Sequence, residues 1–244
     1  EKRITSKTKA IIAVHYGGAP CRIRELQRIA RKHNLMLIED ACEALGAQVD
    51  GIPVGRFGDC AVFSFCANKI ISTGEGGALI TDNKYIYDRV RLLRSHGRET
   101  VDERYTDLGY NFRMSDMAAA LGVSQLAKVD SLIAKRRNLA ARYTSGLLGT
   151  GIPPSIMSQS VFQLYTVRIT KRDIVMRHLQ ESGIGCKVYF HPVHLTEFYR
   201  RNAWQPVSLP VTERVSSEVL SLPMYPGLTQ TEVEYVCEKV REIL

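Results

Sequence analysis

The segment that most constrains the fold lies near the N-terminus, where two apolar runs flank an amphipathic one. Ala10–His15 predicts a buried strand, and it ends at a glycine-rich turn, Tyr16–Pro20. Apolar residues then recur at helical spacing, which predicts an amphipathic helix from Arg22 to His33. Leu35–Glu39 predicts the next strand. Strand, helix and strand form the βαβ unit of a parallel sheet, so we expect an α/β fold with Asp40 at the carboxyl end of the second strand. Open α/β sheets bind their ligands at that edge.

A lysine lies between two further apolar runs. Residues 60–63 and 78–81 each predict a buried strand, and Lys69 stands between them beside hydroxyl groups and the glycines of residues 74–77. Burial disfavours a charged ammonium, and a neutral amine can form a Schiff base with a carbonyl. The alternative is an ordinary surface lysine in a loop.

Asp40 is the second residue that can carry chemistry. An unpaired buried carboxylate is costly, so we expect it to have a cationic partner. A protonated pyridine nitrogen is one such partner, and holding that proton makes pyridoxal 5′-phosphate (PLP) a better electron sink. The alternative is that Asp40 caps the following turn. Ser64 and nearby backbone N–H groups can bind a phosphate. An aspartate that ends one strand and a lysine that follows the next, such as Lys69, are what a PLP enzyme requires.

Composition bounds the environment and the partners. The net charge is +8, but Lys and Arg alternate with acidic residues and no run of five like charges occurs. An anionic small-molecule substrate explains this charge as well as nucleic acid does. The six cysteines are scattered without a CxxC pair, which indicates reduced thiols in a cytoplasm. No segment is long and apolar enough to span a membrane, and the polar N-terminus lacks an apolar signal core.

The remaining pattern divides the chain into two domains. After the lysine segment, we expect a helix that starts at Asp82, an irregular loop over residues 95–110 and a long helix capped by Ser115. Gly149–Pro154 is the best linker candidate. Beyond it the pattern is α+β: we expect strands at 162–169 and 186–190, a helix at 173–181 and a last helix with a capping box at 229–232. We therefore predict a large domain at 1–150 and a smaller one at 151–244.

Eight short stretches together resemble the DegT-type sugar aminotransferases. The matching stretches are Thr8–Gly18, Ile38–Ala41, Gly55–Asp59, Phe63–Lys69, Gly74–Gly77, Arg94–Gly97, Gly109–Met114 and Ser221–Pro226. The resemblance covers essentially the whole chain and implies PLP fold type I, with a mainly parallel sheet in a large domain and a smaller C-terminal α+β domain. It also implies transfer of an amino group from glutamate to a keto group on a nucleotide-linked sugar, for surface glycans or secondary-metabolite sugars.

The resemblance assigns roles residue by residue. Lys69 resembles the Schiff-base lysine that also shuttles the proton, and Asp40 resembles the partner of the pyridine nitrogen. Ser64 resembles a phosphate ligand. Asn111 resembles a residue that crosses a dimer interface to the partner's cofactor phosphate, which implies a homodimer with shared sites.

Some positions depart from the family pattern or allow a second interpretation. Glu43 stands against the cofactor ring where relatives usually carry Gln or His, and its carboxylate could repel the phenolate. Cys66 stands where His or Tyr is common. His191 and His194 lie in a region that borders the sugar-nucleotide site in relatives. Their H-x-x-H spacing also fits a zinc pair, but no third ligand is evident, so no metal is expected.

The resemblance leaves two alternatives to a sugar aminotransferase. The family places a substantial portion before Ala10, with the first strands of the large domain, so we expect a sheet that is incomplete at its N-terminal side. A truncated or degenerate homologue that binds a partner without turnover is therefore one alternative, and Glu43 favours it too. Sugar dehydration is the other, but dehydratases of this family replace the lysine with histidine, and Lys69 argues against that.

Overall fold

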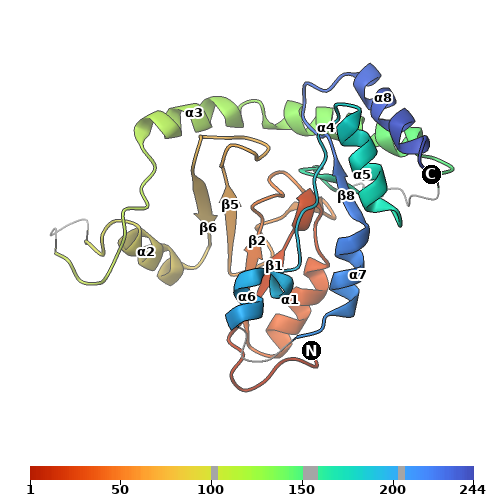
Figure 1. Cartoon of the computed structure of the whole chain (residues 1–244). Helices are drawn as coiled ribbons and strands as arrows, with labels where there is room; N and C mark the ends of the chain where they lie inside the picture. The colour runs from red at the N-terminus through yellow and green to blue at the C-terminus, as the bar shows by residue number, and fades with distance from the viewer. Residues whose placement is uncertain (100–103, 151–158, 203–206) are drawn as a thin grey trace. The chain divides into compact units, whose positions relative to one another are not determined.

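The computed structural model describes residues 1–99, 104–150, 159–202 and 207–244 (Figure 1). These residues form two compact units. Unit 1 contains Glu1–Ile133 and Gln159–Gln163, and unit 2 contains the rest. We call Gln159–Gln163 the return segment, because the chain leaves unit 1 and comes back to it for these five residues. The division after Ile133 differs in place from the predicted boundary at residue 150. Residues 151–154 of the predicted linker lie outside the described residues, directly after the predicted boundary. The predicted division into domains 1–150 and 151–244 therefore stays a prediction.

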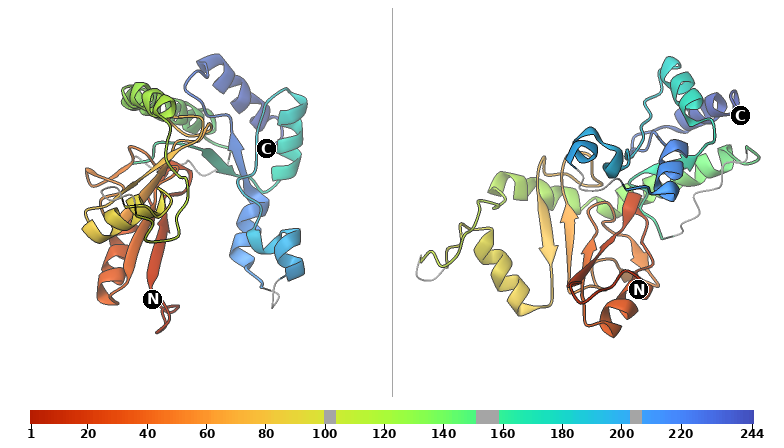
Figure 2. Two further views of the ribbon diagram at one scale, coloured as in Figure 1. Left: turned by 90° about the vertical axis from the view of Figure 1, so that its left-hand side faces the viewer. Right: turned by 60° about the horizontal axis from the view of Figure 1, so that its bottom comes forward.

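A four-stranded sheet in the order β1-β2-β5-β6 forms the centre of unit 1 (Figures 1 and 2). The strands are β1 (Ala10–Val14), β2 (Met36–Asp40), β5 (Cys60–Ser64) and β6 (Gly77–Ile80). The pairs β1–β2 and β2–β5 are parallel, and β6 runs antiparallel to β5. Helix α1 (Ile23–Lys32) joins β1 to β2, so the predicted βαβ unit is confirmed. A small hairpin, β3 (Gln48–Val49) with β4 (Ile52–Pro53), lies between β2 and β5 in the sequence.

Two apolar clusters hold this sheet in place. One packs α1 against β1 and β2, and its buried members are Ala13, Ile23, Ala30, Leu37 and Phe57. The other joins the segments that follow β2 and β5 to the return segment, through Ala41, Ala44, Ile70, Ile71 and Val161 among others. Burial of apolar surface is the main stabilising term in such clusters. The second cluster therefore fixes the loops on either side of Lys69.

The helices that follow the sheet begin at side-chain caps. Asn83 accepts hydrogen bonds from two N–H groups at the start of α2 (Lys84–Leu93), and Ser115 accepts one at the start of α3 (Asp116–Leu126). The long helix predicted after Ser115 is instead α3 followed by α4 (Val129–Gly146), with a bend of 57° between them. The α-helical ladder stops because the N–H group of Lys128 bonds to Gln125, three residues back. Among the described residues no single helix is long and apolar enough to cross a membrane, although the bent pair meets that test jointly.

Unit 2 combines one antiparallel strand pair with helices. Its elements are β7 (Tyr165–Arg168), α5 (Arg172–Glu181), α6 (Glu197–Asn202), α7 (Pro210–Glu218), β8 (Val219–Leu222) and α8 (Gln230–Arg241), together with most of α4. The predicted capping box of α8 is confirmed, since Thr229 and Glu232 bond to each other's backbone N–H groups. The predicted strand at 186–190 is wrong: only Lys187 pairs, with Ser221 of β8, as an isolated bridge.

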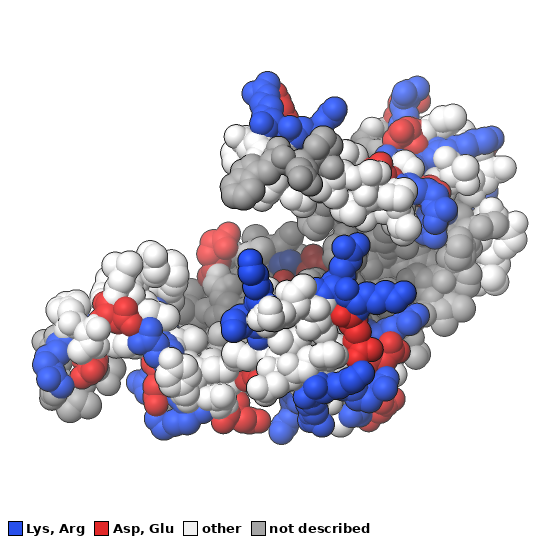
Figure 3. Space-filling model, turned by 90° about the horizontal axis from the view of Figure 1, so that it is seen from below, with Lys and Arg blue, Asp and Glu red and all other residues white. Residues whose placement is uncertain are grey.

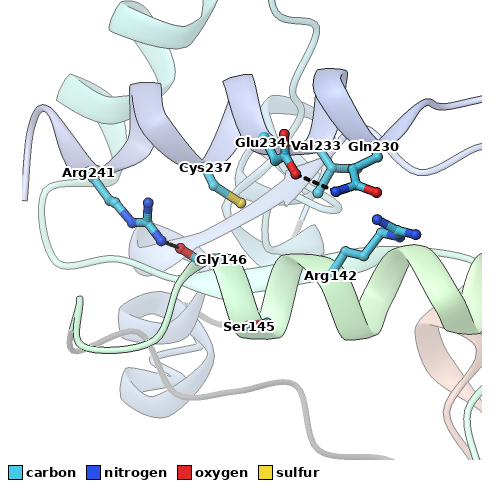
Figure 4. A pocket seen from close by; sticks show the side chains of 8 residues that line it. All are labelled: Arg142, Ser145, Gly146, Gln230, Val233, Glu234, Cys237 and Arg241. Carbon is cyan, nitrogen blue, oxygen red and sulfur yellow. Dashed lines mark hydrogen bonds between the residues drawn. The ribbon is translucent and has the colours of Figure 1, made fainter.

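A cavity of about 300 Å³ lies between α4 and α8 in unit 2 (Figure 4). Its lining residues are Arg142, Ser145, Gly146, Gln230, Val233, Glu234, Cys237 and Arg241. Gln230 donates to Glu234 at 2.6 Å, and Arg241 donates to the carbonyl of Gly146, so much of its polar lining is bonded internally. No predicted site residue lines this cavity.

Candidate active site

The carboxyl ends of β2 and β5 bring the predicted residues to one edge of the sheet. Asp40 ends β2 and pairs in register with Val62, two positions before Ser64. The chain after Ser64 forms the loop that carries Lys69 and returns through β6. The loop after β1 joins the same edge, because the N–H group of His15 donates to the carbonyl of Asp40 at 3.0 Å. Topology alone therefore collects Asp40, Ser64 and Lys69.

The amine of Lys69 is paired with Glu43. Nζ of Lys69 lies 3.4 Å from Oε1 of Glu43, and the two side chains are only 15% and 17% exposed. The other carboxylate oxygen of Glu43 accepts a hydrogen bond of 2.7 Å from the N–H group of Gly17. Glu43 therefore has a cationic partner and a backbone donor. Its expected repulsion of a cofactor phenolate stays a prediction.

The thiol of Cys42 shows how closely these charges are grouped. Burial raises the pKa of Cys42 to about 12; Asp40 adds to the rise through a hydrogen bond and its charge, and Lys69 opposes it. The N–H group of Cys42 also donates to Oδ1 of Asp40 at 3.1 Å, which is the capping contact that the alternative interpretation of Asp40 predicts. Because this thiol stays protonated at neutral pH, Cys42 is not a nucleophile here. The nucleophile role of Lys69 stays a prediction.

The loop around Lys69 is held by its own backbone. The N–H group of Phe65 donates to Gly76 and that of Thr73 donates to Phe65, both at 2.8 Å. Oγ of Ser64 accepts a long hydrogen bond of 3.4 Å from Cys66. Ser64 therefore lies at the start of a tied loop, beside N–H groups, as a phosphate ligand would need. Its phosphate role stays a prediction.

A buried carboxylate directly before Asp40 supports the edge from behind. Glu39 is fully buried and accepts hydrogen bonds of 2.7 Å from each of the N–H groups of Gly55, Phe57 and Gly58. It also bonds to Nε2 of His15 at 3.1 Å. Sequence reasoning did not assign Glu39 or His15 a role. The signal was a glutamate inside an apolar strand, since such a buried acid requires several donors.

Asn111 bonds to residues outside this group of side chains. It pairs with Ser95 as an isolated bridge, and its Oδ1 accepts a hydrogen bond from Arg113 at 3.2 Å. Its side chain is exposed, and no hydrogen bond among the described residues joins it to Lys69. This placement leaves the predicted role across a dimer interface untested.

The two histidines predicted for the sugar-nucleotide site belong to unit 2. Nε2 of His194 lies 3.0 Å from Oε1 of Glu213, and His191 is exposed. Within the described part of the chain, no group of three His, Cys, Asp or Glu side chains is placed to hold a metal ion. The substrate roles of His191 and His194 stay predictions.

The residues at the sheet edge fit PLP. This cofactor needs a lysine for its aldehyde, an anion for its pyridine nitrogen and donors for its phosphate. Asp40, at the end of β2, could supply the anion, and Lys69, in the loop that follows the neighbouring parallel strand β5, could supply the amine. Ser64 and the N–H groups beside it are suitable for the third. When bound, PLP supplies an electron sink for the carbon next to an amino group.

Comparison with known proteins identifies the family. Residues 1–241 match the model of the DegT/DnrJ/EryC1/StrS aminotransferase family. GDP-perosamine synthase from Caulobacter vibrioides is 38% identical over 256 aligned positions, which cover 100% of this chain and 68% of that protein. The chain thus spans about two thirds of the length of this relative.

Solved structures of similar fold agree with the family match. Helicobacter pylori PseC, an aminotransferase involved in the biosynthesis of pseudoaminic acid, superposes with a TM-score of 0.92 at 29% identity, over 99% of this chain and 68% of PseC. Streptococcus pneumoniae Spr1654, solved in a PLP form, superposes with a TM-score of 0.91 at 26% identity, over 99% of this chain and 70% of that one. The expected PLP fold type I is confirmed, and the relatives favour an enzyme over the non-catalytic alternative. The chain belongs to the DegT/DnrJ/EryC1/StrS aminotransferase family and is an aminotransferase.

Proposed function

We propose that this protein uses PLP to move an amino group from glutamate to the keto group of a nucleotide-linked sugar, in the biosynthesis of surface glycans or secondary-metabolite sugars. The observation that carries the proposal is the largely buried amine of Lys69 at the same sheet edge as Asp40. The names of GDP-perosamine synthase and PseC support a sugar as the amino acceptor.

Each residue at the edge has one task in this proposal. With PLP bound, Nζ of Lys69 would hold the cofactor at its aldehyde carbon, with release of water, and the freed amine would move a proton at the donor carbon. The carboxylate of Asp40 keeps the pyridine nitrogen protonated, and Ser64 binds the phosphate. Glu43 balances the charge of Lys69 while the amine is free, and it would face the cofactor ring when PLP is bound. His191 and His194 contact the sugar nucleotide.

We also propose a homodimer in which Asn111 reaches the partner's cofactor phosphate. The support is the apolar surface beside it: Phe112 is 72% exposed, and Met117 and Val123 of α3 are 84% and 73% exposed. Large exposed apolar side chains that lie together on a surface mark a protein–protein interface. All six cysteines are free thiols, which supports the proposed cytoplasmic location. Figure 3 shows acidic and basic side chains interspersed on one face, which agrees with the alternation of the two charges along the sequence.

Replacement of the lysine tests the proposal. Lys69→Ala should lower amino transfer from glutamate to GDP-, UDP- or dTDP-linked keto sugars by at least about a thousandfold, because the chain loses both its nucleophile and its proton carrier. Transfer is measured with PLP present by mass spectrometry of the sugar nucleotide. Lys84→Ala removes an exposed lysine of the same unit and should leave the rate unchanged. A Lys69→Ala protein with near-normal turnover would refute the assignment.

A further inference from the structure

The peptide bond between Asn68 and Lys69 is held at both of its polar atoms. The N–H group of Lys69 donates to the carbonyl of Cys66 at 3.1 Å, within the same loop. The carbonyl oxygen of Asn68 accepts a hydrogen bond of 2.5 Å from Nε2 of Gln163, a side chain of the return segment that is 6% exposed. A peptide group is planar, so two hydrogen bonds on opposite sides fix its orientation. They also fix the position of the Lys69 Cα, from which its side chain leaves the backbone.

The return segment is anchored to the loop after β1. The N–H group of Val161 and the hydroxyl of Ser160 each donate to the carbonyl of Gly18 at 3.0 Å. Gly18 has a φ of +91°, and a Cβ on it would lie 2.7 Å from the backbone nitrogen of Gln163. Glycine therefore allows the return segment to approach this loop closely. Val161 is fully buried in the cluster that contains Ile70, so the attachment is apolar as well as polar.

These contacts close into a ring around the lysine. The N–H group of Gly17, next to Gly18, donates to Glu43, and Glu43 pairs with the amine of Lys69. From the backbone of Lys69 the ring continues through Asn68 to Gln163, and from there along the return segment to Gly18. The lysine is thus held at its amine by Glu43 and at its backbone by Gln163.

We propose that Gln163 is a positioning residue for Lys69. Its amide holds the carbonyl of Asn68 and so sets where the long, flexible side chain of Lys69 begins. The lysine side chain is a flexible chain of four carbons, so its amine keeps a defined position only when both the backbone and the amine are held. Misplacing a reacting group by about 1 Å can cost about a hundredfold in rate. This inference rests on the proposed function of Lys69.

The test measures how fast Lys69 reacts with an aldehyde, rather than turnover. The 244-residue chain is mixed with PLP and reduced with borohydride, and the modified lysines are located by mass spectrometry of peptides. Gln163→Met keeps the length of the side chain and removes the donor, so labelling of Lys69 should slow by about tenfold or more. Labelling of exposed Lys84 in the same sample should stay unchanged. The matched control, Gln48→Met, alters an exposed glutamine of unit 1 and should label like the unaltered chain.

Amide hydrogen exchange supplies a second readout that needs no cofactor. The N–H group of Lys69 should exchange faster in Gln163→Met, because its peptide plane has lost one of its two anchors. Gln163→Asn keeps the amide but shortens the side chain by one methylene, so it should show the same losses if Gln163→Met does not fold. Unchanged labelling and unchanged exchange of Lys69 in a folded variant would overturn the proposal. If the unaltered chain labels Lys69 no faster than Lys84, the proposed function fails instead, and the exchange measurement still judges the role of Gln163.

Discussion

At the scale of single residues, Glu39 predicts a pH-dependent stability. Burial alone would raise the pKa of Glu39 above 4.5, but the hydrogen bond with His15 and those from the N–H groups of Gly55, Gly58 and Phe57 lower it overall. A carboxyl whose pKa is lowered by folding stabilises the native state above its unfolded pKa, and this stability is lost as the pH falls below that value. We expect the free energy of unfolding, measured by urea titration, to fall as the pH drops below about 4.5. In Glu39→Gln this component should be absent.

The same substitution has a cost at neutral pH. Glu39→Gln places an amide N–H₂ group where N–H donors converge, so it should lower the free energy of unfolding by about 3 kcal/mol at pH 7. Glu25→Gln, on the surface of α1, is the control and should change it by less than about 0.5 kcal/mol. Equal acid sensitivity in the two variants would show that Glu39 does not set this part of the pH dependence.

The sequence was informative about residues that directly follow strands. Asp40 and Lys69 could be placed at one edge because parallel neighbours end on the same side of a sheet. The pairing of Glu43 with Lys69 could not be predicted, since it depends on how two loops fold toward each other. The hydrogen bond from Gln163 to the carbonyl of Asn68 was even harder to predict from the sequence. It spans 95 positions, and the alternating pattern over residues 162–169 predicted a strand there rather than a contact with the loop that carries Lys69.

At the scale of secondary structure, the capping box of α8 predicts a local contribution to stability. Thr229→Ala removes the oxygen that accepts the N–H group of Glu232, at 3.2 Å. The free energy of unfolding should fall by about 1 kcal/mol, and the amide of Glu232 should exchange faster. Thr231→Ala changes an exposed threonine in the same turn that does not cap the helix. Alanine favours a helix interior more than threonine does, so Thr231→Ala should not lower the free energy of unfolding, and a loss of the same size there would mean that the effect is not specific to the cap.

Elements with strong local signals were predicted, and those set by their neighbours were not. The βαβ unit has two apolar runs, a helical periodicity and a glycine turn, and it formed as expected. The apolar residues after Asp116 predicted one helix, but the backbone bond from Lys128 ends α3 early, and no side-chain pattern records that bond. Residues 186–190 have strand composition, but only Lys187 finds a partner in β8. Strand formation requires a partner as well as a propensity.

At the scale of the whole molecule, a shared active site predicts complementation between two inactive variants. Lys69→Ala and Asn111→Ala chains are each expected to be inactive as homodimers. Mixed dimers contain one site in which both residues are intact, so random exchange of subunits should restore about a quarter of the unaltered activity. The control mixes Lys69→Ala with a chain that carries both changes and should restore none. No recovery after exchange verified by mass spectrometry would contradict a shared site.

The return segment also has a consequence for the order in which the protein is made. Domains usually fold from the N-terminus as they leave the ribosome, but unit 1 needs Val161, which is fully buried in its core, and Gln163. Residues 1–133 therefore leave the ribosome before the second apolar cluster of unit 1 is complete. Until residue 163 emerges, the cluster that contains Ile70 and Ile71 lacks Val161, and the carbonyl of Asn68 lacks its donor. During synthesis, unit 1 thus passes through a stage in which the loop that carries Lys69 has been made but is not yet anchored by Gln163. A chaperone would bind unit 1 in that form.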